Sequence, residues 1–350
     1  MSDPRSHLAL SFRLHGAAAR HSGSAFYGDL CELLAQDAER DGVVVGAMGE
    51  HATAPFDDAY NLRLLGGLHR MVLTGEAPAL RAHYPSTGGD GDAEAAWRLI
   101  EPILRAPPPA VLDALARGCQ TNEVGRAAPL ASGFAVVGAR TGLPLRLLEL
   151  GSSAGLNLRL DRYYYESGTQ AWGDSSSAVR FVDDWDGGAP PFAPATEVAS
   201  RRGCDLAPID PNAPGTDITL LSFVWPGQSL RFERLRAALD IARDVPVDID
   251  TAPADAWLAA QLASPIRGVA TIVFHSIVWG YFSTETRNRV TATLAEAGGR
   301  ATDDAPLAWV RLEPAPKMIH AELRCTTWPG GDEQLLATAG FHAGRVTWLA

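Results

Sequence analysis

The sequence predicts an α/β fold that follows an all-helical N-terminal part. Apolar residues recur at helical spacing through the first part of the chain, and apolar strand-like segments alternate with helical segments from Leu143 onward. A glycine-containing turn directly follows the first of these strands. We therefore expect a helical cap over residues 1–140 and an α/β ligand-binding domain over residues 141–350.

The predicted elements follow from these patterns in chain order. The expected helices of the first part are Ala25–Ala38, Asp57–Thr74, Ala93–Leu104 and Ala110–Ala116. The expected strands of the second part are Leu145–Leu150, Glu197–Ile209 with a turn at Asp205, Val245–Ile249, Val269–His275, Leu307–Leu312, Glu322–Thr327 and Arg345–Leu349. The expected helices between them are Leu156–Tyr164, Leu230–Ala242, Ala254–Leu262 and Thr284–Ala297.

The composition is that of an ordinary globular protein and disfavours several classes of function. The chain has 350 residues, of which 46% are hydrophobic and 20% are charged. A formal net charge of −11 argues against nucleic acid as a partner. The sequence contains no apolar stretch of membrane-spanning length and no secretory signal, so we expect a cytoplasmic protein that acts on a small molecule. The cysteines and histidines have no zinc-binding spacing, and we expect no metal.

The turn after the first strand is the most informative motif. It has the sequence ELGSSAG, from Glu149 to Gly155, and a helical pattern is expected to follow it. A strand, a glycine turn and a helix together present free backbone N–H groups to a ligand. The carboxylate of Glu149 suits a ligand with hydroxyl or ammonium donors, so we expect a nucleoside-type site. Its residues would be Glu149, Gly151, Ser153, Gly155 and Asn157.

Three interpretations of this turn remain open. The E-x-G-x-x-x-G spacing resembles the S-adenosylmethionine-binding turn of Rossmann-like methyltransferases, although Ser153 stands where a glycine is common. The G-x-S-x-G spacing also fits a hydrolase nucleophile elbow with Ser153 as nucleophile, and His275 follows it in the required chain order. The third interpretation is a glycine turn that only packs the next segment against the strand.

Two aspartates would complete a nucleoside site. Asp205 comes at the end of a predicted strand and would accept hydrogen bonds from the ribose hydroxyls, provided that an insertion separates Gly168 from Thr196. Asp255 precedes a predicted helix and would meet the adenine edge. Each aspartate could instead serve only as a turn or helix-capping residue.

Further candidates lie on two polar or aromatic segments. His275, at the end of a β-branched strand, would act as a general base, and Trp279 and Tyr281 would form the wall of a substrate site. The segment TNEVGR supplies Asn122, Glu123 and Arg126, which would close over the cofactor or bind a substrate carboxylate. These aromatic residues could also be core residues, and TNEVGR could be a hinge between domains.

Several motifs together resemble one protein family. They are TNEVGR, LLELGSSAGLNLRLDRYYY, RRGCDLAPID, VWPGQSLRFERLRAALDIAR, VFHSIVWGYF, PLAWVRLEP and FHAGRVTWL. This series, which covers nearly the whole chain, resembles the uncharacterised bacterial family called domain of unknown function 2332 (DUF2332). The resemblance implies a Rossmann-like sheet of the methyltransferase type, sandwiched by helices.

The sequence therefore leads to three functional hypotheses. The first is a methyltransferase that uses S-adenosylmethionine as cofactor and acts on a small molecule. The second is a serine hydrolase that uses Ser153. The third is a non-catalytic protein that binds a nucleoside ligand on a degenerate Rossmann core. The methyl acceptor and the oligomeric state are left open.

Overall fold

The computed structural model describes residues 3–117, 119, 121–193, 196–317 and 319–350. Its chain divides into two compact units. Unit 1 comprises Met1–Thr121 and Ala213–Arg236, and unit 2 comprises Asn122–Asn212 and Ala237–Ala350. Helix α7 (Ala127–Thr141) belongs to unit 2, although it precedes residue 141. Helix α7 belongs to unit 2 because it packs on the sheet: a Cβ added at its Gly133 would lie 2.8 Å from Val310.

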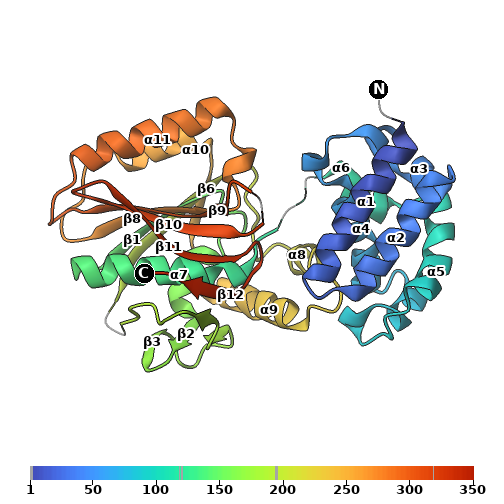
Figure 1. Ribbon diagram of the computed structural model, residues 1–350, viewed down its shortest axis with the longest axis horizontal. Helices are drawn as coiled ribbons and strands as arrows, with labels where there is room; N and C mark the ends of the chain where they lie inside the picture. The colour runs from blue at the N-terminus through green and yellow to red at the C-terminus, as the bar shows by residue number, and fades with distance from the viewer. Residues whose placement is uncertain (1–2, 118, 120, 194–195, 318) are drawn as a thin grey trace. The chain divides into compact units, whose positions relative to one another are not determined.

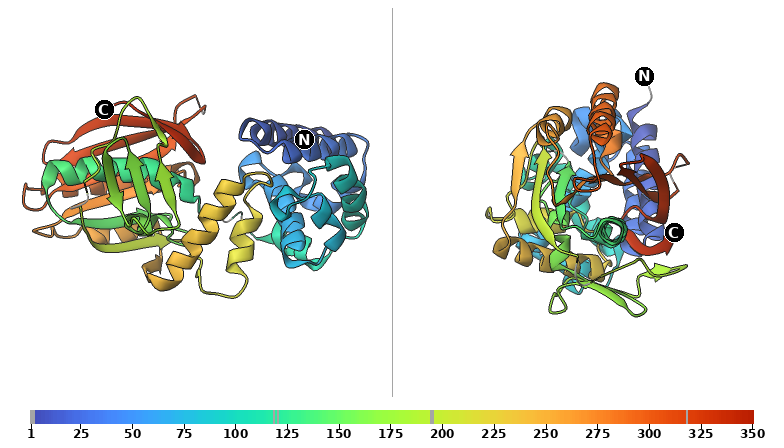
Figure 2. Two further views of the ribbon diagram at one scale, coloured as in Figure 1. Left: turned by 90° about the horizontal axis from the view of Figure 1, so that it is seen from below. Right: turned by 90° about the vertical axis from the view of Figure 1, so that its left-hand side faces the viewer.

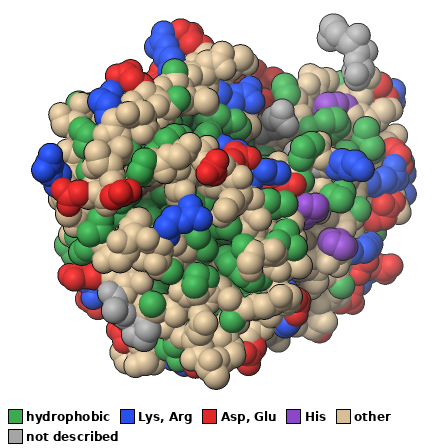
Figure 3. Space-filling model, turned by 60° about the vertical axis from the view of Figure 1, so that its left-hand side comes forward, with side chains coloured by type: hydrophobic (Ala, Val, Ile, Leu, Met, Phe, Trp, Pro, Cys, Tyr) green, Lys and Arg blue, Asp and Glu red, His purple; other side chains and the backbone are tan. Residues whose placement is uncertain are grey.

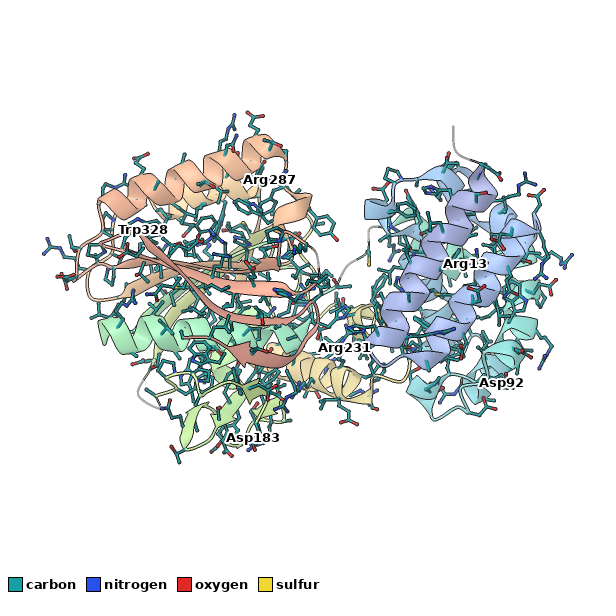
Figure 4. The ribbon with its side chains drawn as sticks, viewed as in Figure 1. Arg13, Asp92, Asp183, Arg231, Arg287 and Trp328 are labelled. Carbon is teal, nitrogen blue, oxygen red and sulfur yellow. The ribbon has the colours of Figure 1, made fainter. Side chains whose placement is uncertain are left out.

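Unit 1 is built from helices. They are α1 (Pro4–His21), α2 (Ala25–Glu39), α3 (Val43–Met48), α4 (Tyr60–Thr74), α5 (Ala93–Arg105), α6 (Pro109–Ala116) and α8 (Thr216–Ser222), followed by the start of α9 (Ser229–Asp244). Helices α1 and α5 begin at side-chain caps, Asp3 and Asp92, which accept hydrogen bonds from first-turn N–H groups. Arg13 on α1, labelled in Figure 4, forms ion pairs with Glu32 and Glu39 of α2.

The helix predictions for this unit are confirmed with small changes at the ends. Helices α2, α5 and α6 match the predicted ranges to within one residue at each end. Helix α4 begins at Tyr60 because Phe56–Asp58 form a separate 3-10 turn. Their apolar faces meet in one core that includes Leu30, Leu34 and Leu64.

Unit 2 contains a mixed sheet of nine strands (Figure 1). Its strand order is β5-β12-β11-β10-β9-β8-β1-β6-β7. Strands β7 (Asp248–Thr251), β6 (Val198–Asp205), β1 (Leu145–Leu150), β8 (Ala270–Ser276) and β9 (Leu307–Pro314) form a parallel series. The antiparallel strands β10 (Ala321–Trp328), β11 (Asp332–Gly340) and β12 (Ala343–Trp348) extend it, and β5 (Trp185–Asp186) lies at the edge. The predicted α/β class is thus confirmed.

Helices cover both faces of this sheet. Helix α7 lies on one face, and α10 (Ala254–Gln261) and α11 (Thr284–Gly299) lie on the other (Figure 1). Trp328, labelled in Figure 4, packs against α11 so closely that a Cβ added at Gly298 would lie 2.6 Å from its ring. A small sheet of β2 (Tyr164–Ser167), β3 (Gln170–Gly173) and β4 (Arg180–Val182) lies beyond α7 (Figure 2). Its strands β3 and β4 fall within the insertion predicted between Gly168 and Thr196, whereas β2 precedes it.

Some predicted elements are wrong. The helix expected over Leu156–Tyr164 is only a short 3-10 helix, η6 (Asn157–Arg162), and Tyr164 begins β2. Strand β7 begins at Asp248, three residues later than the predicted Val245. The sequence analysis also missed β11, which places β10 and β12 on either side of it.

Two general properties follow from the described residues. The face in Figure 3 carries acidic and basic side chains interspersed with hydrophobic ones. None of the helices in the described part of the chain is long and apolar enough to cross a membrane.

Candidate functional site

The strand order of unit 2 indicates where a ligand is expected to bind. The chain moves from β1 outward to β6 and β7, and then returns to β8 on the other side of β1. In open α/β sheets, ligands bind at the carboxyl ends of the strands where the order reverses in this way. Glu149 and the glycine turn lie at this end of β1, and His275 lies at this end of β8.

The glycine turn is tightly built. Gly151 and Gly155 have φ values of +71° and +66°, a left-handed conformation that favours glycine. A Cβ added at Gly151 would lie 2.5 Å from Val278 Cγ2, and one added at Gly155 would lie 2.8 Å from Ile249 Cδ1. The turn therefore requires glycine for conformation and for space, and it brings the segment after β8 against the end of β1.

Glu149 is a buried carboxylate with an unsatisfied oxygen. Its side chain is only 2% exposed, and its Oε2 atom has no hydrogen-bond partner. Burial, and to a lesser extent the nearby charge of Asp205, raises the pKa of Glu149 well above its usual value. An ionised acceptor in this position lacks the donor that would stabilise it, and a ligand could supply that donor.

Asn157 presents a second unsatisfied acceptor after the same turn. It is 1% exposed, and its Oδ1 atom has no partner, while its amide group donates weakly to the Glu123 carbonyl (3.5 Å). The predicted residue Asn122 accepts a hydrogen bond from the Leu156 N–H (2.9 Å). The segment with Asn122 and Glu123 is thus hydrogen-bonded to Leu156 and Asn157, where η6 begins.

Arg126 connects this segment to the strand of His275. Its guanidinium donates to the carbonyls of Ser276 (3.3 Å) and Phe341 (3.1 Å), and its charge acts on Glu149. Asn122, Glu123 and Arg126 therefore lie near the glycine turn, and their closing over a cofactor or binding a substrate carboxylate stays a prediction.

Asp205 lies at the end of β6, beside the turn. Its Oδ2 accepts from the Ser153 N–H (2.8 Å) and its Oδ1 accepts from the Ala207 N–H (2.9 Å). Both oxygens thus hold backbone, the role of a turn aspartate that the sequence left open. Asp205 fixes Ser153, whose φ of +51° is unusual for a residue other than glycine.

Asp255 lies apart from these hydrogen bonds, in the first turn of α10. Its carboxylate forms an ion pair with Arg289 of α11 (3.3 Å) and is 11% exposed. The structure therefore gives Asp255 a partner on the neighbouring helix.

His275 is fully buried, and both of its ring nitrogens are engaged. The indole N–H of Trp309 can only donate, so Nε2 of His275 accepts from it (3.1 Å). The remaining nitrogen, Nδ1, then carries the proton and donates to Glu313 Oε1 (2.7 Å). This pattern leaves no ring nitrogen of His275 for a substrate, and it makes His275 a residue that positions Glu313.

Glu313 is the site residue that the sequence analysis missed. Its Oε1 also accepts from the N–H groups of Val278 (3.1 Å) and Trp279 (3.3 Å), whereas its Oε2 is buried without a partner. One signal was present in the sequence, since Glu313 lies at the carboxyl end of the strand that follows the His275 strand. Parallel strands end at the same edge of a sheet, which brings such residues together.

A pocket of about 440 Å³ lies beside Glu313. Trp279 and Trp309 line it, and the Trp279 ring also stacks on His275 with a centroid distance of 5.0 Å. The predicted residue Tyr281 is 76% exposed, in the 3-10 turn η7 (Trp279–Tyr281). Trp279 therefore lies at the pocket as a wall residue, and Tyr281 lies on the surface.

The comparisons with known proteins now give the family. The model of a family described as "Uncharacterized protein conserved in bacteria (DUF2332)" matches residues 9–348. The chain belongs to the DUF2332 family. A search of curated proteins finds no significant match.

The match extends across both units, so the glycine turn and the Glu313 pocket both fall within the DUF2332 region.

Arg159 is a further residue beside the glycine turn, and the sequence analysis did not predict its role. Arg159 is 2% exposed and donates to the carbonyls of Gly155 (2.8 Å) and Val245 (2.6 Å). Its hydrogen bonds connect the glycine turn to the segment before β7. Arg159 therefore stabilises the turn, and its guanidinium is not exposed to a ligand.

Proposed function

We propose that this DUF2332 protein binds S-adenosylmethionine at the glycine turn after β1 and transfers the methyl group to a small molecule. One observation carries the proposal. Two buried acceptors without partners, Glu149 Oε2 and Asn157 Oδ1, flank a turn at the place where the strand order reverses.

The two acceptor oxygens fit the amino-acid end of this cofactor, which carries an ammonium group. An ammonium group supplies N–H donors to both oxygens, and its positive charge favours the ionised form of Glu149. Gly151 and Gly155 adopt left-handed backbone conformations in which a side chain would be strained and would overlap Val278 or Ile249. Because both oxygens lie below the surface, binding requires movement of the segment around Asn122 and Glu123 that packs on η6.

The main role of the protein's residues would be to position the two reactants, and none of them would act as a nucleophile. The cofactor provides an electrophilic methyl group on sulfur, and such transfers depend chiefly on the alignment of two bound molecules. Glu149 and Asn157 would hold the amino-acid end, and Asp205 would keep the turn in its conformation. Glu313 would accept the proton that the acceptor loses, with His275 fixing its orientation.

The hydrolase hypothesis is supported by one observation, the left-handed backbone of Ser153. Two others oppose it. A nucleophile elbow leads into an α-helix, whereas this turn leads into the short 3-10 helix η6. In addition, the ring nitrogens of His275 are engaged by Trp309 and Glu313 and are not available to activate a serine.

Calorimetric titration with S-adenosylmethionine and S-adenosylhomocysteine tests the proposal, after removal of any ligand that co-purifies. We expect micromolar binding, about −8 kcal/mol, and much weaker binding of adenosine, which lacks the ammonium group. Titrations in buffers of different ionisation enthalpy would report proton release from Glu149 on binding.

Absence of binding to the folded protein would contradict the cofactor site. Labelling of Ser153 by a fluorophosphonate, abolished in Ser153→Ala, would instead support the hydrolase. Binding without methyl transfer to any acceptor would favour a non-catalytic nucleoside-binding protein.

A further inference from the structure

The pocket beside Glu313 has a defined set of charges. It is lined by the carboxylates of Glu313, Glu322 and Glu333 and by the guanidiniums of Arg311 and Arg324. Its volume of about 440 Å³ lies within the range of small-molecule sites.

The two guanidiniums are already paired with two of the carboxylates. Arg324 contacts Glu322 and Glu333 at 2.8 Å each, and Arg311 also pairs with Glu333. Glu313 takes its hydrogen bonds from His275 and from two backbone N–H groups. Since the hydrogen bonds make this histidine neutral, the negative charge of Glu313 is the one that the pocket does not balance.

The remaining acceptor on Glu313 is well defined. All three hydrogen bonds reach Oε1, so Oε2 keeps its full capacity to accept and has no partner. A buried carboxylate oxygen is strongly stabilised by a charged N–H donor and costs free energy without one.

The aromatic walls favour the same ligand. Arg311 already lies over the Trp309 ring, 4.2 Å from its centroid, so this wall holds a cation in the structure. The Trp279 ring stacks on His275 and also lines the pocket. A cation that meets Glu313 would therefore lie beside an indole ring that can stabilise it.

We propose that the Glu313 pocket binds a small protonated amine. Because Glu313 Oε2 is buried beside the pocket, a shift of the pocket wall would let it accept from the ammonium group, and Trp279 would pack against the alkyl part of the amine. As a methyl acceptor, this amine rests on the proposed function; as a ligand of the pocket, it does not. In the methylation step, the deprotonated amine nitrogen forms the bond to the methyl carbon and the carbon–sulfur bond breaks with its electron pair on sulfur. The proton of the amine passes to Glu313.

The test is a titration of the full-length protein with short alkyl monoamines and diamines, without S-adenosylmethionine. Amides and carboxylates of the same length serve as uncharged and anionic controls. Binding would be followed by calorimetry and by the shift in melting temperature. We expect binding of one or more amines and none of the controls.

Two variants locate the site. Glu313→Gln keeps an oxygen for the three hydrogen bonds now made to Oε1 and replaces only the free acceptor, so it should fold. We expect it to weaken amine binding by about tenfold or more. The matched control is Glu322→Gln, which changes a carboxylate of the same pocket that Arg324 already pairs. It should alter binding much less.

Three results would overturn the proposal: no amine binds the wild-type protein, Glu313→Gln binds as well as wild type, or both variants lose binding equally. Because the cofactor is absent from these titrations, failure of the cofactor site would leave them unchanged. Amine binding in a protein that does not bind S-adenosylmethionine would retain the pocket and refute only the methyltransferase.

Discussion

The two units differ in where they leave buried polar groups unsatisfied. In the described residues of unit 1, the side-chain atoms without partners are His15 Nε2, Arg63 Nε and the Tyr84 hydroxyl. They lie in different helices or turns and include hydrogen-bond donors. In the described residues of unit 2, they are Glu149 Oε2, Asn157 Oδ1 and Glu313 Oε2. All three are acceptor oxygens: Glu149 and Glu313 lie at the carboxyl ends of β1 and β9, and Asn157 begins η6 after the glycine turn.

This difference favours unit 2 as the unit that would bind a ligand under the proposed function. The unsatisfied atoms of unit 1 are scattered and include donors, whereas those of unit 2 are all acceptors, which one class of ligand, a hydrogen-bond donor, would satisfy. The same contrast is visible in paired groups. His69 of unit 1 is buried but satisfied at both nitrogens, by the Ser222 carbonyl and the Ser86 hydroxyl. Glu313 of unit 2 is satisfied at one oxygen only.

The largest expected effect compares one glycine from each unit. Gly151 in unit 2 and Gly75 in unit 1 both have positive φ, +71° and +82°. A Cβ at Gly151 would overlap Val278, whereas one at Gly75 would meet nothing within 4 Å. We expect Gly151→Ala to cost about 2–4 kcal/mol and Gly75→Ala about 1 kcal/mol. Urea denaturation measures both, and equal costs would refute the tight turn.

The next effect concerns the pH dependence of unit 1. Burial lowers the pKa of His69 to about 4, below its usual value of 6.5. The unfolded chain therefore binds the proton more readily, and stability is lost as pH falls from about 6.5 toward 4. The loss amounts to about 3 kcal/mol. The free energy of unfolding of His69→Gln should fall less steeply over this range, and an unchanged slope would contradict the assignment.

Glu149 in unit 2 should show the opposite sign. Its raised pKa in the folded state means that its contribution to stability is full below about pH 4.5 and is lost as pH rises through the folded-state pKa. Glu149→Gln removes this loss, so we expect it to stabilise the protein by about 1–3 kcal/mol near pH 8. The exposed Glu296→Gln on α11 is the control. Destabilisation by Glu149→Gln would show that the carboxylate has a structural partner.

The sequence was informative where local pattern decides structure. The amphipathic spacing of Ala25–Ala38 predicted α2 to within one residue, and the β-branched run Val269–His275 predicted β8. Helix α2 buries one face and β8 is buried along almost its whole length, and the order of apolar residues in each segment predicts this burial.

The sequence was less informative where distant contacts decide structure. Leu158 and Leu160 of η6 are buried, as is Leu156 directly before it, and Arg159 reaches a carbonyl as far away as that of Val245. No local periodicity encodes those contacts, so the predicted helix was wrong. Glu313 was missed for a similar reason, because its role depends on the pairing of β9 with β8 and on the tautomer that Trp309 imposes on His275.

The most direct test of the account measures stability and binding on one variant. Glu149→Gln should unfold at a higher denaturant concentration than wild type near pH 8, and should bind S-adenosylmethionine at least about tenfold more weakly. A gain in stability with a loss of affinity is expected only if the buried carboxylate is kept for a ligand. Unchanged affinity for the cofactor, or no binding by the wild-type protein, would contradict the assignment of Glu149 to a cofactor site.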